Sequence, residues 1–348
     1  ETFHRAVSGE TQLLELPDRI GGTVGLPPVG VVDMREELRA GNQNLFSRSL
    51  QSSMAHALSR KRQVLLFLNR RGTATLVQCR HCGHVFSCPR CSVAFALHAA
   101  RGRLVCHRCG RTAPVPEACP VCRSRRIRFL GIGTQRVVEE VREMFPSARV
   151  LRWDSDIPTG EKGGSTLRDL VQAREVDIIV GTQMVAKGHD FPEVTLVGVV
   201  GADVGLELPD YRASERAFQL ISQASGRAGR GVHPGCVVVQ TYEPDNYVIR
   251  SAATHDYRSF FEREIRYRQE AFYPPFSSVV KLLYSNSDES RCRREVERVH
   301  RIAEDRAAPA GLRITGPAPA FVRRLRGRYR WQFTVRGAQP AEALCGID

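Results

Sequence analysis

Long apolar runs are missing from this sequence of 348 residues. A helix that crosses a membrane needs about 18 or more consecutive apolar residues, and no stretch approaches that length. There is also no signal peptide at the start of the chain. These absences exclude a helical membrane protein and predict a soluble, cytoplasmic one. The chain begins with Glu1 rather than methionine, so we expect it to be part of a longer protein.

Lysine is scarce, and so are acids in one segment. Only four of the 51 basic residues are lysines, and the formal net charge is +14. Arginine pairs bidentately with phosphate, so this composition favours a polyanionic partner, although an arginine-rich proteome would give the same bias. Between Cys79 and Arg128, ten arginines accompany a single acid, Glu117. That segment stays basic after eight thiolates and two Zn²⁺ are counted, which fits a nucleic acid or an acidic protein surface.

Cysteine is concentrated in the same segment. Eight of the eleven cysteines form four CxxC pairs within 44 residues, namely Cys79/Cys82, Cys88/Cys91, Cys106/Cys109 and Cys119/Cys122. Each pair can grip one Zn²⁺ with two thiolates, and a structural site closes when a second pair supplies the other two. A disulfide framework is the alternative, but it suits small secreted chains. The pattern therefore predicts two structural zinc ions.

The flanking sequence predicts how the pairs combine. Apolar runs at 64–68 and 127–130 flank the cysteine block, so we expect it to be an insertion between two strands of a larger sheet. An insertion must end close to where it begins. The outer pairs then form one site, from Cys79, Cys82, Cys119 and Cys122, and the inner pairs a second, from Cys88, Cys91, Cys106 and Cys109. Pairing in consecutive order is the alternative.

After the cysteine block, strands alternate with helices. Apolar runs predict strands at 149–153, 177–180, 194–200 and 236–241, and helical periods occur at 134–145, 165–174 and 214–225. Strands that are apolar throughout are typical of a parallel sheet with helices on both faces. The expected fold is therefore an α/β sandwich of RecA size. Upstream, we expect strands at 10–16 and 29–33 and a helix at 45–58.

From about residue 251 the pattern changes. A charged helix at 257–270, a strand at 278–284 and an amphipathic helix at 288–306 predict a small α+β domain. The remainder is basic, with five arginines from 323 to 330 beside Tyr329 and Trp331. Trp331 either stacks on a base or is buried on a strand. No obvious terminal element follows, so we expect this domain to be truncated.

An arginine motif ends the predicted helix at 214–225. The residues from Gln223 to Arg230 read QASGRAGR, which places Arg227 and Arg230 three residues apart on one helical face. Gly226 and Gly229 permit the close approach of another backbone. The two arginines can then reach a phosphate across a cleft, as arginine fingers do. A solvated basic helix end is the alternative.

A second motif, GTQMVAKGHDFP at 181–192, follows the predicted strand at 177–180. The carboxyl edge of a parallel sheet is where such folds bind ligands. Its backbone amides and Lys187 are candidates to hold a phosphate, and Asp190 is a candidate to accept from a ribose hydroxyl.

Together these two segments resemble motifs V and VI of superfamily 2 helicases. Further short motifs occur in the order found in the PriA family of replication-restart helicases, also called primosomal protein N′. They are VLLFLNRRG at 64–72, GIGTQ at 131–135, YRASER at 211–216, YPPF at 273–276 and GRYRWQ at 327–332. The resemblance covers nearly the whole chain.

The resemblance implies an ATP-dependent helicase that unwinds DNA with 3′-to-5′ polarity at stalled forks. Its implied partners are branched and single-stranded DNA, primosome and helicase-loading proteins and single-stranded DNA-binding protein, in the nucleoid. The chain would hold the tail of the first helicase lobe and a linker (1–62), a RecA-like second lobe (63–78 and 127–250), the two-zinc insertion (79–126) and the α+β C-terminal domain (251–348).

The resemblance also assigns candidate site residues. Arg227, Arg230 and Gln223 would act on ATP, and Gly188, Asp190, Gly226 and Gly229 would contact the nucleotide. DNA contacts would come from Thr134, Thr182, Gln183, Lys187, Arg70 and Arg71. Thr134 belongs to GIGTQ, which opens a helix whose free amides suit a phosphate, with a simple helix cap as the alternative. Solvation is the alternative for Arg70 and Arg71.

The sequence lacks two parts of a helicase motor. Neither GxxxxGK[ST] for the phosphates nor a DEXX-type acidic box for Mg²⁺ occurs, so ATP and Mg²⁺ would bind only with a first lobe, and we expect no turnover by this chain alone. The alternative is a non-enzymatic, zinc-stabilised scaffold that binds forks through a degenerate motor. A zinc-ribbon RNA-binding or transcription module would leave the arginine motif unexplained.

Overall fold

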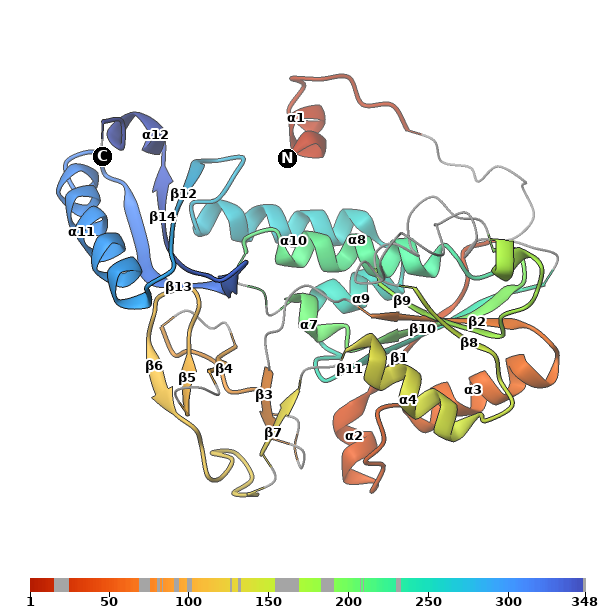
Figure 1. The fold of residues 1–348 in the computed structure, drawn as a ribbon. Helices are drawn as coiled ribbons and strands as arrows, with labels where there is room; N and C mark the ends of the chain where they lie inside the picture. The colour runs from red at the N-terminus through yellow and green to blue at the C-terminus, as the bar shows by residue number, and fades with distance from the viewer. Residues whose placement is uncertain are drawn as a thin grey trace.

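The chain forms three sheets, each at the centre of its own unit (Figure 1). The computed structural model describes residues 1–15, 25–68, 76–79, 82, 84–90, 94–98, 102–125, 127–130, 133–153, 169–182, 191–206, 208, 210–229 and 233–346. Among these residues, no helix is both long enough and apolar enough to cross a membrane.

The largest unit is built on a six-stranded parallel sheet with the order β1-β11-β10-β2-β9-β8. Its strands are β1 (Val29–Asp33), β2 (Gln63–Leu68), β8 (Val150–Trp153), β9 (Ile178–Gly181), β10 (Val194–Val200) and β11 (Cys236–Thr241). Its helices are α2 (Met34–Arg39), α3 (Arg48–Ser59), α4 (Thr134–Met144), α7 (Asp203–Leu206), α8 (Ala213–Ser225), α9 (Tyr247–Ala253) and α10 (Tyr257–Glu270). This is the α/β architecture, a parallel sheet with helices on both faces, that the sequence predicts.

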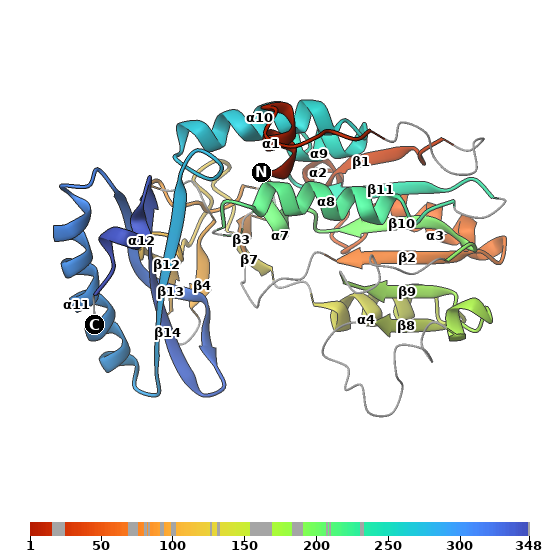
Figure 2. The same cartoon turned by 90° about the horizontal axis from the view of Figure 1, so that it is seen from above.

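Both faces of this sheet are buried. Successive side chains of a strand point to opposite faces, and in β2 Leu65 and Phe67 pack on one face while Val64 and Leu66 pack on the other. Helices α8, α9 and α10 contribute to the first core, and α3 and α4 contribute to the second. Figure 1 shows α8 and α10 above the strands and α3 and α4 below them, and Figure 2 shows the strands side by side from β1 to β8. A sheet covered on both faces needs apolar strands throughout, which explains the continuous apolar runs.

The N-terminal segment contributes more to this unit than the sequence predicts. Strand β1 pairs in parallel with β11, from Val29↔Val237 to Asp33↔Thr241, and α3 packs on β2 and β10. These elements lie in the segment assigned to a first-lobe tail and linker (1–62), so the observed sheet begins upstream of the boundary expected at residue 63. The strand expected at 10–16 is not found in the described residues 10–15. Leu14 there is exposed, so no partner strand covers this stretch.

Helix α1 (Thr2–Val7) packs on α10 through aromatic side chains. The ring of Phe3 lies 5.1 Å from that of Tyr257 and 4.7 Å from that of Phe261, edge to face in both cases. Of the helix expected at 165–174, residues 165–168 lie outside the described residues, and 169–172 are helical.

The cysteine-rich insertion has a sheet of its own. Its five strands have the order β6-β5-β4-β3-β7 and comprise β3 (Leu76–Cys79), β4 (Ala96–His98), β5 (Arg103–Val105), β6 (Thr112–Pro114) and β7 (Ile127–Leu130). Strands β3 and β7 pair antiparallel, with Cys79 opposite Ile127. The insertion therefore ends beside its starting point, as expected. However, β7 belongs to this small sheet and not to the larger one, because its partner is β3.

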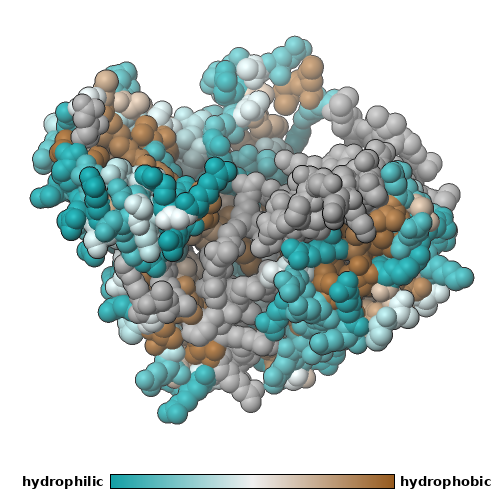
Figure 3. Space-filling model, in the orientation of Figure 1, coloured by the Kyte–Doolittle hydropathy of each residue, from teal (hydrophilic) through white to brown (hydrophobic). Residues whose placement is uncertain are grey.

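The C-terminal domain is an antiparallel sheet with the order β12-β14-β13, covered by one long helix. Its elements are β12 (Ser278–Asn286), α11 (Glu289–Ala307), β13 (Arg313–Leu325), β14 (Arg328–Gly337) and α12 (Pro340–Ala343). The side chain of Trp331 is buried against Cys292 and Val296 of α11, which places it in the core of the domain. Figure 3 shows mainly hydrophilic side chains on the face of this domain that is in view, at the left.

Helix α10 belongs with the large sheet, although the sequence assigns it to the C-terminal domain. Its Phe260 lies in the core beneath α8 and stacks on Phe218 with ring centroids 4.4 Å apart. The first strand of the α+β domain begins at Ser278, and the helix at 257–270 packs with the large sheet.

Candidate functional site

The outer cysteine pairs form one compact cluster. The Sγ atoms of Cys79, Cys82, Cys119 and Cys122 all lie within 4.8 Å of one another. The Sγ atoms of Cys79 and Cys122 are 3.5 Å apart, and those of Cys82 and Cys119 are 3.6 Å apart. Consecutive pairing would have joined Cys79 and Cys82 to the second pair, so these cysteines cluster in the nested arrangement.

The inner cluster contains Cys88, Cys106 and Cys109, whose Sγ atoms also lie within 4.8 Å of one another. The Sγ atoms of Cys88 and Cys109 are 3.7 Å apart. The fourth predicted ligand, Cys91, lies outside the described residues. Cys88 and Cys106 are fully buried and pack in the small core of the insertion, with Val77, Phe95 and Leu104.

The same tight turn recurs in these CxxC loops. The amide of Cys106 donates to the carbonyl of Arg111 at 2.8 Å, and the amide of Cys119 donates to that of Ser124 at 2.9 Å. In the first loop Gly110 donates back to the carbonyl of Cys106, with a φ of +76°. Arg123 does the same in the second loop, with a φ of +60°. These turns direct both thiols of a pair to one point.

The chemistry of the clusters fits a metal ion. Burial raises the pKa of the Cys82 thiol to about 12 and that of Cys106 to about 11, because a buried thiolate loses its hydration. Such thiols are ionised near neutral pH only when a cation compensates their charge. Four sulfur ligands at this spacing are typical of structural zinc sites. The clusters are therefore of the zinc-binding kind.

The inner CxxC loop also contacts the C-terminal domain. The imidazole Nδ1 of His107, whose side chain is 6% exposed, lies 3.0 Å from the carbonyl oxygen of Pro319 in β13. Arg108 donates to the hydroxyl of Tyr273. A Cβ atom on Gly110 would lie 2.5 Å from the carbonyl oxygen of Pro317. This loop therefore joins the insertion to the C-terminal domain.

The arginine motif is arranged differently from the prediction. Helix α8 ends at Ser225, and the amide of Arg227 donates to Ala224 in the turn that follows. Arg227 is therefore on a turn and not on a helical face, because the chain leaves the helix at Gly226. Arg230 lies outside the described residues. Gln223 is exposed near the end of α8.

Gly229 fixes the path of this turn. Its φ is +65°, and its amide donates to the carbonyl of Val194 at 3.0 Å. A Cβ atom at this position would lie 2.4 Å from the backbone nitrogen of Gly235. Only glycine allows two backbones to cross this closely, so the sequence GRAG holds Arg227 beside the first residue of β10.

The described residues of the two motifs, QASGRAGR at 223–230 and GTQMVAKGHDFP at 181–192, lie at opposite edges of the sheet. Arg227 follows α8 at the amino edge, where β10 begins. Thr182, which is 7% exposed, follows β9 at the carboxyl edge. The segment from Gln183 to Asp190, which contains the predicted Lys187 and Gly188, lies outside the described residues.

The other predicted DNA contact that the structure describes is Thr134. It is the first residue of α4, its side chain is 1% exposed, and the N-cap is Gly133, which offers no capping side chain. A contact to phosphate at this helix end would therefore come from backbone amides and not from the Thr134 hydroxyl. Arg70 and Arg71 lie outside the described residues.

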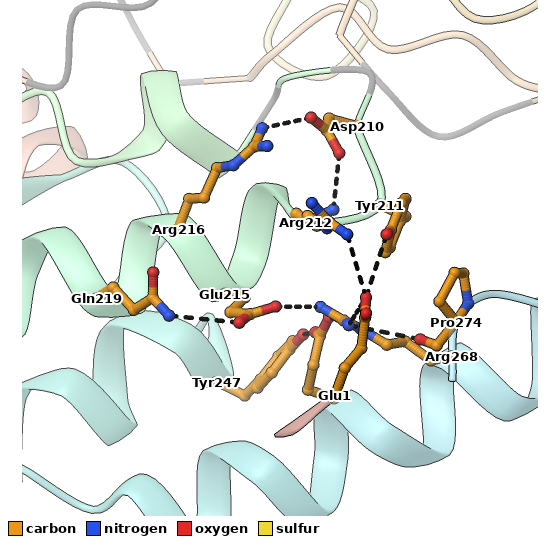
Figure 4. Close-up of polar contacts among 11 residues, drawn as sticks. Glu1, Asp210, Tyr211, Arg212, Glu215, Arg216, Gln219, Tyr247, Arg268 and Pro274 are labelled. Carbon is orange, nitrogen blue, oxygen red and sulfur yellow. Dashed lines mark hydrogen bonds and ion pairs between the residues drawn. The ribbon is translucent and has the colours of Figure 1, made fainter. Parts of the chain in front are cut away.

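A buried ion-pair network went unpredicted (Figure 4). Arg268 is 2% exposed and donates at 2.7 Å to Glu264 and at 2.7 Å to Glu215, which lies in the YRASER motif. Tyr211 of the same motif donates to Glu1 at 3.2 Å. The network joins α8 to α10 and α1. Arg268 also pairs with Glu1 at 3.7 Å, 267 residues away in the chain, so no local signal predicts the network.

Asp203 is a second buried charged residue that the sequence did not suggest. It follows β10 at the carboxyl edge and is fully buried, where its carboxylate accepts from the hydroxyl of Thr241 at 2.5 Å and the amide of Tyr242 at 3.0 Å. Burial raises its pKa to about 6.

Comparison with known proteins agrees with this architecture. The family model "Primosomal protein N C-terminal domain" matches residues 269–345, and "PriA DNA helicase Cys-rich region (CRR) domain" matches residues 88–114. The "Replication restart protein PriA" of Bacillus subtilis is 41% identical over 342 residues, which cover 98% of this chain and 42% of that protein. The chain belongs to the PriA family. Its C-terminal domain and its cysteine-rich region match the models of that family.

Other PriA proteins are similarly related. The PriA protein of Synechocystis is 41% identical, and the match covers 96% of this chain and 41% of the relative. The PriA protein of Rickettsia felis is 38% identical, and the match covers 96% of this chain and 51% of the relative. The chain thus spans about half or less of the length of the PriA proteins it matches. Among solved structures, yeast Dbp5 bound to RNA and ADP BeF3 covers 77% of this chain and 51% of its own, with 10% identity and a TM-score of 0.37, which is too low to support any comparison of sites.

Proposed function

We propose that this chain is the part of a replication-restart protein that carries the second motor lobe, a two-zinc insertion and the C-terminal domain. Joined to a first lobe, it would use ATP to unwind forked DNA with 3′-to-5′ polarity and support primosome assembly in the cytoplasm. The observation that carries this proposal is 41% identity to a PriA protein across 98% of the chain. The nested cysteine clusters add independent support.

Two zinc ions would complete the insertion. Cys79, Cys82, Cys119 and Cys122 would hold one, and Cys88, Cys91, Cys106 and Cys109 the other. The ions would act as structural cross-links. The loops themselves fix the thiol directions through their backbone hydrogen bonds, and the inner loop would then present its docking residues to the C-terminal domain.

In the motor, Arg227 would act on the nucleotide held by the first lobe. The crossing of Gly229 and Gly235 holds its turn rigid, and a positioned guanidinium can stabilise charge that develops on a γ-phosphate. Arg230 and Gln223 would assist, with Gly188, Asp190 and Gly226 close to the nucleotide. Thr182, Gln183 and Lys187 at the other edge of the sheet would relay the change to the DNA backbone, alongside the segment at Thr134 and the pair Arg70 and Arg71.

ATP hydrolysis by the full-length protein tests this role. We expect Arg227→Ala to reduce the rate with forked DNA by about 10³-fold or more, with zinc content unchanged. Arg250→Ala is the matched control, because Arg250 is an exposed arginine on α9. Hydrolysis retained in Arg227→Ala would remove the proposed role.

The same assay separates a motor from a scaffold. A full-length wild-type protein that binds forked DNA but hydrolyses no ATP would establish the non-enzymatic alternative. The recruitment of helicase-loading proteins and single-stranded DNA-binding protein, and a nucleoid location, remain proposals that rest on the family.

A further inference from the structure

Two adjoining cavities lie where the large unit, the insertion and the C-terminal domain meet. The first has a volume of about 300 Å³ and the second a volume of about 250 Å³. They share Arg108 of the inner CxxC loop, Asp210 and Tyr211 before α8, and Tyr273 before β12. The lining of the first cavity adds Lys281 and Arg336 of the C-terminal domain, so each of the three units contributes to this junction.

The first cavity is bounded by the polar face of the C-terminal sheet. In β14 the side chains of Trp331, Phe333 and Val335 pack in the cores beneath α11, so the alternate residues point to the opposite face. Those residues, Gln332, Thr334 and Arg336, line the cavity, and Lys281 and Thr315 lie directly across from Thr334 on the neighbouring strands. One row of polar side chains thus crosses all three strands.

Positive charge dominates this first cavity. Its described lining contains Arg108, Arg212, Arg216, Lys281 and Arg336. The acid among these lining residues is Asp210, whose carboxylate is already occupied by the Arg216 guanidinium and the Arg212 amide (Figure 4).

Two atoms of the lining have hydrogen-bonding capacity to spare. The Nε of Arg336 and the Oε1 of Gln332 are buried without a hydrogen-bond partner in the part of the chain that the structure describes. Burial also lowers the pKa of Lys281, as expected for a cation whose charge is incompletely balanced. An anion in the cavity would accept from the Nε of Arg336 and balance the charge of Lys281, whereas the Oε1 of Gln332 is an acceptor and needs a donor instead.

The second cavity is aromatic. Four tyrosines line it, Tyr211, Tyr247, Tyr267 and Tyr273, together with Arg263. Tyr211 and Tyr273 stack on each other with ring centroids 5.3 Å apart and an interplanar angle of 14°. Cationic grooves that alternate with aromatic rings are typical of single-strand binding sites, because the cations attract phosphates and the rings accept bases.

We propose that this pair of cavities binds single-stranded DNA, with a phosphate in the first cavity and a base against the tyrosines of the second. The proposal rests on the proposed function and deepens it, since it gives DNA a site outside the two helicase motifs. Cavities of 250 to 300 Å³ are at the small end for ligand pockets, which suits single nucleotides and excludes a duplex. The aromatic half offers rings to a base beside the cations that attract a phosphate, which favours a nucleotide over a purely acidic peptide.

Binding of a fluorescein-labelled 15-nucleotide dT strand by the zinc-loaded chain, followed by anisotropy across a salt series, tests the site. The double variant Lys281→Gln/Arg336→Gln should bind about tenfold more weakly. Its slope of log affinity against log salt should fall by about 0.7 for each phosphate that the variant no longer neutralises. The matched control is Arg294→Gln/Arg301→Gln, which removes two exposed arginines of α11 on the opposite side of the sheet.

Each outcome of this experiment decides one question. Wild-type chain that binds no strand would count against the proposed DNA-binding function itself. Wild-type binding with equal affinity and slope in both double variants would overturn the cavity site alone. Displacement of the strand by a polyglutamate peptide at similar concentration would also overturn it, because the tyrosines would then add nothing.

A second variant guards against a folding defect in the first. Thr334→Glu places a carboxylate opposite Lys281 on a half-buried strand position, and it should weaken strand binding while zinc content and thermal unfolding stay as in the wild type. Photocrosslinking of 5-iododeoxyuridine in the strand should label Tyr211 or Tyr267. Labelling confined to other regions would contradict the proposed path.

Discussion

Gly110→Ala should loosen the contact between the cysteine-rich insertion and the C-terminal domain. Gly110 has a φ of +76°, and a Cβ atom there would lie 2.5 Å from the backbone oxygen of Pro317. A backbone oxygen cannot rotate away as a flexible side chain can. The new methyl group must therefore push β13 from the inner CxxC loop, which also breaks the hydrogen bond between His107 and Pro319.

The expected cost combines backbone strain with one broken hydrogen bond. A non-glycine residue in the left-handed region costs about 1 kcal/mol, and the hydrogen bond contributes about 1 kcal/mol, for about 2 kcal/mol in all. Gly102→Ala is the matched control within the same insertion, since Gly102 has a φ of +57° but nothing lies within 4 Å of its added Cβ. The control should show only the strain of about 1 kcal/mol.

Hydrogen exchange of the zinc-loaded chain measures the difference. A gap of about 1 kcal/mol predicts amides of β13 that exchange roughly fivefold faster in Gly110→Ala than in Gly102→Ala. Equal exchange in the two variants would refute the reasoning, because backbone strain alone would then explain both.

Two further predictions concern metal and pH. Native mass spectrometry should find two zinc ions per wild-type chain and one zinc ion in Cys79→Ser. The control Cys236→Ser should keep two zinc ions, because Cys236 is exposed outside the clusters. One zinc ion or none in the wild type would contradict the nested sites. Burial raises the pKa of Asp203 from 3.8 to about 6, so the folded state binds this proton more tightly, and the resulting stability is present below pH 4 and lost as the pH rises through 6. Each unit of pKa shift is worth about 1.4 kcal/mol. Between pH 4 and pH 7, the free energy of unfolding of the wild type in urea should therefore fall by up to about 3 kcal/mol relative to that of Asp203→Asn. A difference between the two proteins that does not change with pH would contradict this.

Much of the large sheet was predictable because a strand that is buried on both faces is apolar along its whole length. The apolar runs at 177–180, 194–200 and 236–241 match β9, β10 and β11 to within one residue. The nested cysteine clusters were predictable for a different reason. An insertion must return to its origin, and the pairing of β3 with β7 realises that constraint directly.

Other features depend on residues that are far apart in the chain. The path of β1 into the large sheet is set by β11, some 200 residues later, and a short apolar run such as 10–16 looks equally strand-like without any partner. The end of α8 before Arg227 follows from the backbone crossing of Gly229 and Gly235. The pattern of QASGRAGR alone fits a continued helix as well as a turn.

The contact between His107 and Pro319 spans 212 residues, which has a consequence for synthesis. A ribosome that adds about 5–20 residues per second needs roughly 10–40 seconds to make β13 after the inner CxxC loop has emerged. During that interval the docking face of the loop is exposed to water and to passing proteins. Metal capture by the nascent insertion would therefore precede assembly of the junction, and a chain that stalls before residue 313 would display an unprotected, folded zinc module to the quality-control machinery.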